Sequence, residues 1–257
     1  MKVVILAGGK GTRLGTQLGT LPKPMVCIGE KPILWHIMKI YSYHGFKDFV
    51  ICLGTKADMI KNYFYEYEII NNDFTIDLAT KSVKYHSAHD EHDWKVTLVD
   101  TGLDTLKGGR IKRIEKYLNS KVNLLTYGDG LCDVNIRDLV KFHKSHGKAV
   151  TITGVKRPSR FGELREKNGK LLSFIEKPHA GGSLINGGYM VFSREMLDCL
   201  TEDVSCDFEF GPLEELARRG QVMMYKHEGN WECMDTERDV VYLNELWNAN
   251  KAFWKLW

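Results

Sequence analysis

The chain has 257 residues, of which 43% are hydrophobic, and 36 basic residues nearly balance 33 acidic ones, giving a formal net charge of +3. This length and composition predict a single α/β domain over residues 1–257 with a well-filled core. The small net charge argues against a nucleic-acid partner, and the lack of a long uncharged apolar run argues against a membrane span or a signal peptide. We therefore expect a cytoplasmic protein that binds neither nucleic acid nor a membrane.

Short apolar runs typical of strands alternate along the chain with patterns typical of helices. In chain order they predict strand 3–6, a helix that starts near Pro32, strand 49–53, helix 57–67, strand 96–99, helix 109–118, strand 123–126, a helix capped by Asn135 and running to 146, strand 150–155, a hairpin over 162–176, strand 189–192, helix 211–219, strand 222–225 and helix 237–250. This alternation predicts a Rossmann-like three-layer α/β fold, with helices on both faces of a mainly parallel, mixed central sheet. Ligands of such sheets bind beyond the carboxyl ends of the strands.

A glycine-rich segment directly follows the first predicted strand. It reads Leu-Ala-Gly-Gly-Lys-Gly-Thr-Arg-Leu over residues 6–14. Because Gly8, Gly9 and Gly11 carry no Cβ, backbone N–H groups can approach an anion closely there. Arg13 and, further along, Lys23 between two prolines add two cations. Together these features predict a phosphate-binding loop.

Spacing excludes two commoner phosphate loops. A dinucleotide fingerprint that starts at Gly9 requires a glycine where Leu14 stands. A Walker A loop requires Gly-Lys followed by Ser or Thr, whereas Lys10 is followed by Gly11. The segment therefore serves a different class of phosphate ligand.

Two acidic side chains follow predicted strands, at the edge of the sheet where ligands are expected to bind. Asp129 lies in a Gly-Asp-Gly turn after strand 123–126, and Asp235 has a similar position in Trp-Glu-Cys-Met-Asp-Thr. Magnesium prefers carboxylate oxygens and bridges phosphate oxygens well. By sequence alone, Asp129 is equally well interpreted as an ordinary turn residue.

Histidines and cysteines give a weaker metal hypothesis. His86, His89 and His92 have helical spacing, but the segment lacks an apolar helical stripe and therefore predicts a solvated loop. The six cysteines contain no Cys-x-x-Cys pair and no zinc-finger spacing, which predicts free thiols.

Ordered motifs along nearly the whole chain resemble those of one enzyme family. After the glycine-rich segment come LPKPM (21–25), KPILWHIMKIYSYHG (31–45), VTLVDTG (96–102), GGRIKRI (108–114), LLTYGDG (124–130), RFGEL (160–164), FIEKP (174–178), INGGYMVF (185–192) and WECMDTERD (231–239). These motifs resemble the signature of the nucleoside-diphosphate-sugar pyrophosphorylases, which join a nucleoside triphosphate to a sugar 1-phosphate and release pyrophosphate.

Within this family, the motifs are most similar to those of the bacterial glucose-1-phosphate cytidylyltransferases. The resemblance implies conversion of CTP and α-D-glucose 1-phosphate to CDP-glucose and pyrophosphate with Mg²⁺, for deoxysugar and O-antigen synthesis. Uridylyl or thymidylyl transfer to a hexose 1-phosphate, and cytidylyl transfer to a different phosphorylated substrate, are alternatives. A non-enzymatic nucleotide-sensing domain on the same fold is another, because a fold does not determine a function.

The resemblance also assigns roles to individual residues. It places Arg13 and Lys23 in catalysis and Asp129 and Asp235 on the metal. For the nucleotide it implies Leu6, Ala7, Gly8, Gly9, Lys10, Gly11, Thr12, Arg13, Lys23, Thr105, Arg110 and Gly128, and for the sugar phosphate Gly162, Glu176, Lys177, Asn186 and Gly187. Because the attacking phosphate oxygen is already ionised, we expect direct in-line attack without a covalent enzyme intermediate.

Departures from the family pattern bear on substrate choice. A small polar residue is expected where Lys107 stands, and an acidic residue where Gly211 stands. The aromatic tail, from Trp247 to Trp257, predicts either a segment that packs on its own core or a contact between subunits. We therefore also expect a homo-oligomer.

Overall fold

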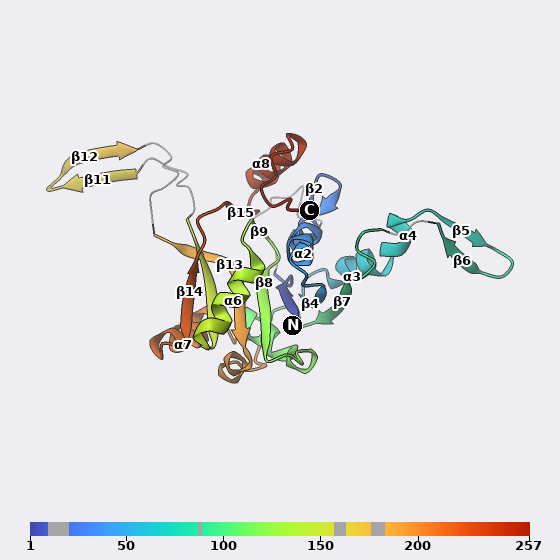
Figure 1. Ribbon diagram of the computed structural model, residues 1–257, viewed down its shortest axis with the longest axis horizontal. Coiled ribbons are helices and arrows are strands. Elements are labelled where there is room, and N and C mark those ends of the chain that lie inside the picture. The colour runs from blue at the N-terminus through green and yellow to red at the C-terminus, as the bar shows by residue number, and fades with distance from the viewer. Residues whose placement is uncertain (10–20, 87–88, 157–162, 176–182) are drawn as a thin grey trace.

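The computed structural model describes residues 1–9, 21–86, 89–156, 163–175 and 183–257 (Figure 1). Its centre is a sheet of seven described strands in the order β14-β10-β13-β8-β1-β4-β7. These strands are β1 (Val3–Leu6), β4 (Asp48–Leu53), β7 (Lys95–Asp100), β8 (Val122–Tyr127), β10 (Val150–Val155), β13 (Ile185–Ser193) and β14 (Val222–Lys226). Only β13 runs antiparallel to its neighbours in this described sheet, so the predicted mainly parallel, mixed sheet is confirmed.

Helices and short strands complete the described part of the chain. The helices are α2 (Ile33–Tyr43), α3 (Ala57–Tyr65), α4 (Tyr67–Asn71), α5 (Lys107–Arg113), α6 (Ile136–His146), α7 (Glu214–Arg218) and α8 (Glu237–Asn248), with short turns η1 (Lys23–Met25), η2 (Glu115–Tyr117), η3 (Arg194–Cys199) and η4 (Glu209–Leu213). The short strands pair as β2 (Cys27–Ile28) with β3 (Lys31–Pro32), β5 (Phe74–Asp77) with β6 (Ser82–Tyr85), β9 (Gly130–Cys132) with β15 (Trp231–Cys233), and β11 (Glu163–Lys167) with β12 (Lys170–Ile175). No helix within these ranges is both long and apolar enough to cross a bilayer.

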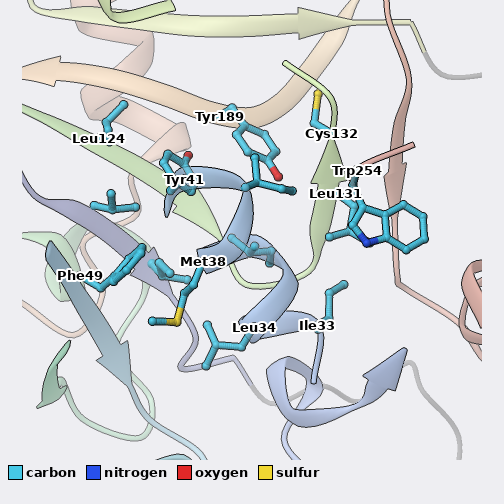
Figure 2. Packing of buried hydrophobic residues seen from close by; sticks show 14 of the residues in the cluster. Ile33, Leu34, Met38, Tyr41, Phe49, Leu124, Leu131, Cys132, Tyr189 and Trp254 are labelled. Atoms are coloured by element: carbon cyan, nitrogen blue, oxygen red, sulfur yellow. The ribbon is translucent and has the colours of Figure 1, made fainter. Parts of the chain in front are cut away.

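The three layers follow from the alternation of side chains along buried strands. Val3 and Ile5 of β1 pack with α2, α6 and α8, whereas Val4 and Leu6 pack with α5 and α7 on the other face. Successive side chains of a strand point to opposite faces, so a fully apolar strand must be covered on both. Figure 2 shows the first of these clusters, in which Tyr41 of α2 stacks on Tyr189 of β13 with ring centroids 5.7 Å apart.

The aromatic tail packs on its own chain, which confirms the first of its two interpretations. Trp254 is fully buried, and its indole N–H donates to Nδ1 of His36 over 3.3 Å. Burial lowers the pKa of His36 to about 4, so the ring is neutral. Its Nε2, 2.9 Å from the carbonyl oxygen of Ile28, then carries the proton and donates.

Several predicted boundaries shift for local reasons. The predicted helix over 57–67 is divided into α3 and α4. The helix predicted from residue 211 starts only at Glu214, because Gly211 has a φ of +100° and Pro212 follows it. Pro32 precedes α2 instead of lying in its first turn. Asn135 caps α6 as predicted, through its side-chain oxygen.

The described part of the chain has two protruding hairpins, of which only one was predicted from the sequence. The predicted hairpin is present as β11–β12, and it turns at Asn168 and Gly169, both with positive φ. The β5–β6 hairpin was missed, because its mixed polar composition was interpreted as a connecting stretch. It projects from the body of the molecule as a separate two-stranded arm (Figure 1).

Candidate active site

A cavity of about 640 Å³ opens at the carboxyl ends of β1 and β8. Its described lining combines the start of the glycine-rich segment, the turn after β8, the segment before α5 and the region around β15. The lining residues are Leu6, Ala7, Gly8, Gly9, Lys23, Pro24, Thr105, Leu106, Lys107, Arg110, Thr126, Tyr127, Gly128, Asp129, Gly130, Asn186, Gly187, Gly188, Glu209, Trp231, Cys233 and Asp235. This is the position at which open α/β sheets bind their ligands.

Predicted nucleotide-binding residues Leu6 to Gly9 and Gly128 lie together in this cavity. The backbone N–H of Gly128 donates to the carbonyl of Leu6 over 3.1 Å, which joins the two strand ends. A Cβ on Gly8 would lie 2.3 Å from the Arg110 guanidinium, so any larger residue there would force the guanidinium out of its position. Lys10, Gly11, Thr12 and the predicted catalytic Arg13 lie outside the described residues.

Arg110 braces the side of the cavity at which the nucleotide is predicted to bind. Its buried guanidinium donates to the carbonyl oxygens of Gly8, Leu53, Gly102 and Leu103 and to the hydroxyl of Thr101, over 2.7 to 3.1 Å. A guanidinium with this many backbone acceptors fixes the segments around it. Thr105 is held similarly, because its hydroxyl accepts from Arg113 over 2.8 Å.

Lys23 lies between the two predicted metal ligands. Its Nζ is 2.6 Å from Oδ2 of Asp129 and 2.6 Å from Oδ1 of Asp235. The prediction placed Lys23 on phosphate, whereas the structure places its ammonium on the carboxylate pair. The three side chains are largely shielded, with 15%, 29% and 24% of their surfaces exposed for Lys23, Asp129 and Asp235.

Strand pairing far apart in sequence brings the two aspartates together. Cys233 of β15 pairs with Gly130 of β9, and the N–H of Met234 donates to the carbonyl of Asp129 over 2.9 Å. The N–H of Asp235 donates to Oδ2 of Asp239, which also forms the capping box that starts α8. The backbones of both aspartates are therefore held by defined elements of the fold.

Electrostatics at this triad favour a bound cation. Burial alone would lower the pKa of Lys23, but the charge of Asp129 and hydrogen bonds to both carboxylates raise it overall, so the ammonium stays protonated. The sulfur of Cys233 lies beside the two carboxylates. One ligand atom from each of Asp129, Cys233 and Asp235 lies within 4.8 Å of the other two. Burial raises the pKa of the Cys233 thiol, and both aspartate charges raise it further. The charged donors are thus hard carboxylate oxygens, which fit magnesium and not a soft metal.

The predicted sugar side of the cavity is only partly described. Asn186 and Gly187 line it, and Trp231 fixes this segment by donating from Nε1 to the carbonyl of Gly187 over 2.7 Å. A Cβ on Gly187 would lie 2.6 Å from Val155. Gly162, Glu176 and Lys177 lie outside the described residues.

The histidine-rich segment forms hydrogen bonds within the protein. His89 Nε2 lies 2.9 Å from Oε1 of Glu68, and its ring packs edge-on against Tyr67. Glu91 is buried against Lys39 at 2.7 Å. The six cysteines all lie in the described part of the chain and are free thiols.

Comparison with known proteins identifies the family. The nucleotidyl transferase family matches residues 2–253. The chain belongs to the nucleotidyl transferase family. The glucose-1-phosphate cytidylyltransferases of Salmonella typhimurium and Salmonella typhi are each 48% identical to it over 258 residues, covering 100% of this chain and 100% of each relative. The solved structure of HddC from Yersinia pseudotuberculosis has the same fold, with a TM-score of 0.70 at 24% identity over 96% of this chain and 99% of that one.

Sequence reasoning missed part of this nucleotidyl transferase cavity. Tyr127, Trp231 and Cys233 lie within the family motifs, so their positions next to Asp129 and Asp235 could have been inferred. Lys107 was noticed only as a departure from the family pattern. Glu209 lies in no motif, and its place on the cavity wall depends on the fold alone.

Proposed function

We propose that the protein transfers a cytidylyl group from CTP to α-D-glucose 1-phosphate, giving CDP-glucose and pyrophosphate. The observation that carries this proposal is full-length similarity at 48% identity to proteins named glucose-1-phosphate cytidylyltransferase. The carboxylate pair at the strand ends supports it, because nucleotidyl transfer between two anions requires a fixed cation. CDP-glucose would serve deoxysugar and O-antigen synthesis, and the free thiols support a cytoplasmic location.

In this proposal the chain acts mainly by positioning and by charge. Backbone around Gly8 and Gly9, held by Arg110, binds the triphosphate together with Arg13, and Lys177 and Glu176 bind the sugar phosphate. The phosphate oxygen of the acceptor attacks the α-phosphorus of CTP in line, and pyrophosphate leaves. The nucleophile is already ionised, so no side chain has to accept a proton from it.

Asp129 and Asp235 would hold Mg²⁺ in the same proposal. The metal would supply charge neutralisation at the phosphate oxygens. Lys23 occupies that carboxylate pair at 2.6 Å from each, and two cations cannot share it closely. We therefore propose that Lys23 leaves the carboxylates for a substrate phosphate once the metal is bound.

We also propose that the protein is a homo-oligomer and that the β5–β6 arm forms the contact. Phe74 pairs with Tyr85 and Ile76 with Val83, so these four side chains lie on one face of the arm. All four are at least 40% exposed. A two-stranded hairpin alone is marginally stable in water, so its apolar face needs a partner.

A second copy of the chain is the proposed partner, because it offers a matching surface. The root of the arm carries further exposed apolar side chains, Tyr65, Ile69 and Ile70. Every copy of the chain thus exposes both an apolar arm and an apolar root surface. In a dimer with two-fold symmetry, the arm of each copy can pack on the root surface of the other.

The first prediction concerns the substrates. CTP with α-D-glucose 1-phosphate and Mg²⁺ should release pyrophosphate faster than ATP, GTP, UTP or dTTP with the same sugar. A panel of nucleoside triphosphates against several sugar 1-phosphates, followed by pyrophosphate release, measures this. Turnover with UTP or dTTP that exceeds turnover with CTP about tenfold would refute the choice of base but not the family.

The second prediction concerns the carboxylate pair. Asp129→Asn and Asp235→Asn should each lower kcat about a hundredfold or more, because each removes a charged oxygen ligand. The free energy of unfolding should change by less than about 1 kcal/mol, because Lys23 keeps the other carboxylate. Steady-state rates and urea unfolding measure both.

Asp138→Asn provides the matched control, since Asp138 is an exposed residue on α6. This variant should keep wild-type turnover. If Asp129→Asn and Asp235→Asn also turn over normally at saturating Mg²⁺, the metal site lies elsewhere.

The third prediction tests the arm. Ile76→Thr combined with Val83→Thr should lower the oligomer mass in light scattering, because threonine keeps the strand but removes apolar surface. Lys84→Gln, on the opposite face of the arm, should leave the mass unchanged. A wild-type monomer, or a double variant with wild-type mass, would contradict an arm-mediated contact.

A further inference from the structure

Glu209 lines the cavity, to which the proposed function assigns two anionic substrates. Its Oε1 accepts from the Tyr127 hydroxyl over 2.5 Å and lies 2.6 Å from Nζ of Lys107. Its Oε2 is buried and has no hydrogen-bond partner among the residues that the structure describes. An unpaired buried acceptor costs free energy, so a partner that arrives with a ligand would stabilise the complex.

The chain builds a specific turn to hold Glu209 there. The N–H of Glu209 donates to Oδ1 of Asp207 over 3.0 Å, and Phe208 beside it is fully buried. Gly211, two residues later, has a φ of +100°, a conformation that side chains other than glycine rarely adopt. The two departures from the family pattern, Lys107 and Gly211, thus belong to one arrangement around Glu209.

The charge pattern of this wall suits a neutral hydrogen-bond donor. A carboxylate repels phosphate, and the Lys107 ammonium, 2.6 Å from Oε1, offsets part of this repulsion. Burial raises the pKa of Tyr127, and the charge of Glu209 raises it further, so the hydroxyl stays protonated and donates to Glu209. Oε2 therefore remains without a donor among the described residues, and a ligand hydroxyl group that reaches it would supply one.

The network leads toward the sugar side of the cavity. Nδ2 of Asn186, assigned to the sugar phosphate, donates to the Tyr127 hydroxyl over 3.3 Å. The chain of contacts thus runs from Lys107 through Glu209 and Tyr127 to Asn186. We propose that Glu209 accepts a hydrogen bond from a hydroxyl group of the acceptor sugar and thereby determines which sugar 1-phosphate is used. This inference rests on the proposed function, in which the acceptor is a sugar 1-phosphate.

Glu209→Gln tests the proposal, because it keeps the shape but removes the charge. The KM for glucose 1-phosphate should rise about tenfold or more, as expected for loss of a hydrogen bond to a charged group, while the KM for CTP changes less than about twofold. Glu202→Gln, at an exposed position outside the cavity lining, should leave both constants unchanged.

A series of deoxy-glucose 1-phosphates identifies the hydroxyl group. The wild type should use one deoxy analogue much less efficiently than glucose 1-phosphate. In Glu209→Gln, the difference in kcat/KM between glucose 1-phosphate and that analogue should largely disappear. Lys107→Met keeps the acceptor and should retain the discrimination, which supplies a second variant if Glu209→Gln proves unstable by thermal unfolding.

Two results would overturn the inference. A rise confined to the KM for CTP would assign Glu209 to the nucleotide, and equal changes in both constants or unchanged discrimination would make it a structural brace. Failure of the proposed function is separate, because the wild type would then use no sugar 1-phosphate in the panel.

Discussion

Two carboxylates, Asp129 and Asp235, are held close enough to share one ammonium group, that of Lys23. Like charges this close repel each other strongly unless a cation lies between them. The lysine therefore stabilises an arrangement that the backbone would otherwise hold under strain. The same arrangement is a ready cation site, and the proposed chemistry depends on it.

The scaffold explains how distant segments meet at this point. Parallel strands β1 and β8 end side by side, which places the glycine-rich segment next to the turn that carries Asp129. The short β9–β15 pairing then brings Asp235 across, and the capping box of α8 anchors it. On the opposite wall, Arg110 and the Lys107–Glu209 pair shape the space left for substrates. In the proposed function, the carboxylate pair fixes the charge of the site, and the wall that carries Glu209 sets the choice of sugar.

The sheet and the two aspartates of the carboxylate pair could be predicted from the sequence, because their signals are local or belong to motifs. Apolar strands such as Val3–Leu6 and the cap at Asn135 are encoded by neighbouring residues. The β5–β6 arm was missed because each of its strands has only four residues, too few for the alternation of apolar and polar side chains to stand out. Glu209 was missed because only tertiary packing brings it to Tyr127. The pairing of Lys23 with both carboxylates was also beyond prediction, since the sequence shows which residues are charged but not which of them pair.

We propose that Lys23 occupies the metal position in the free enzyme. Calorimetric titration of the nucleotide-free protein with Mn²⁺ tests it most directly. Lys23→Ala should bind Mn²⁺ about tenfold or more tightly than the wild type, because a charge-assisted competitor is gone. Lys107→Ala removes a cation from the same cavity, but one that pairs with Glu209 and not with Asp129 or Asp235. This variant should bind Mn²⁺ as the wild type does. Equal or weaker Mn²⁺ binding by Lys23→Ala would contradict the account.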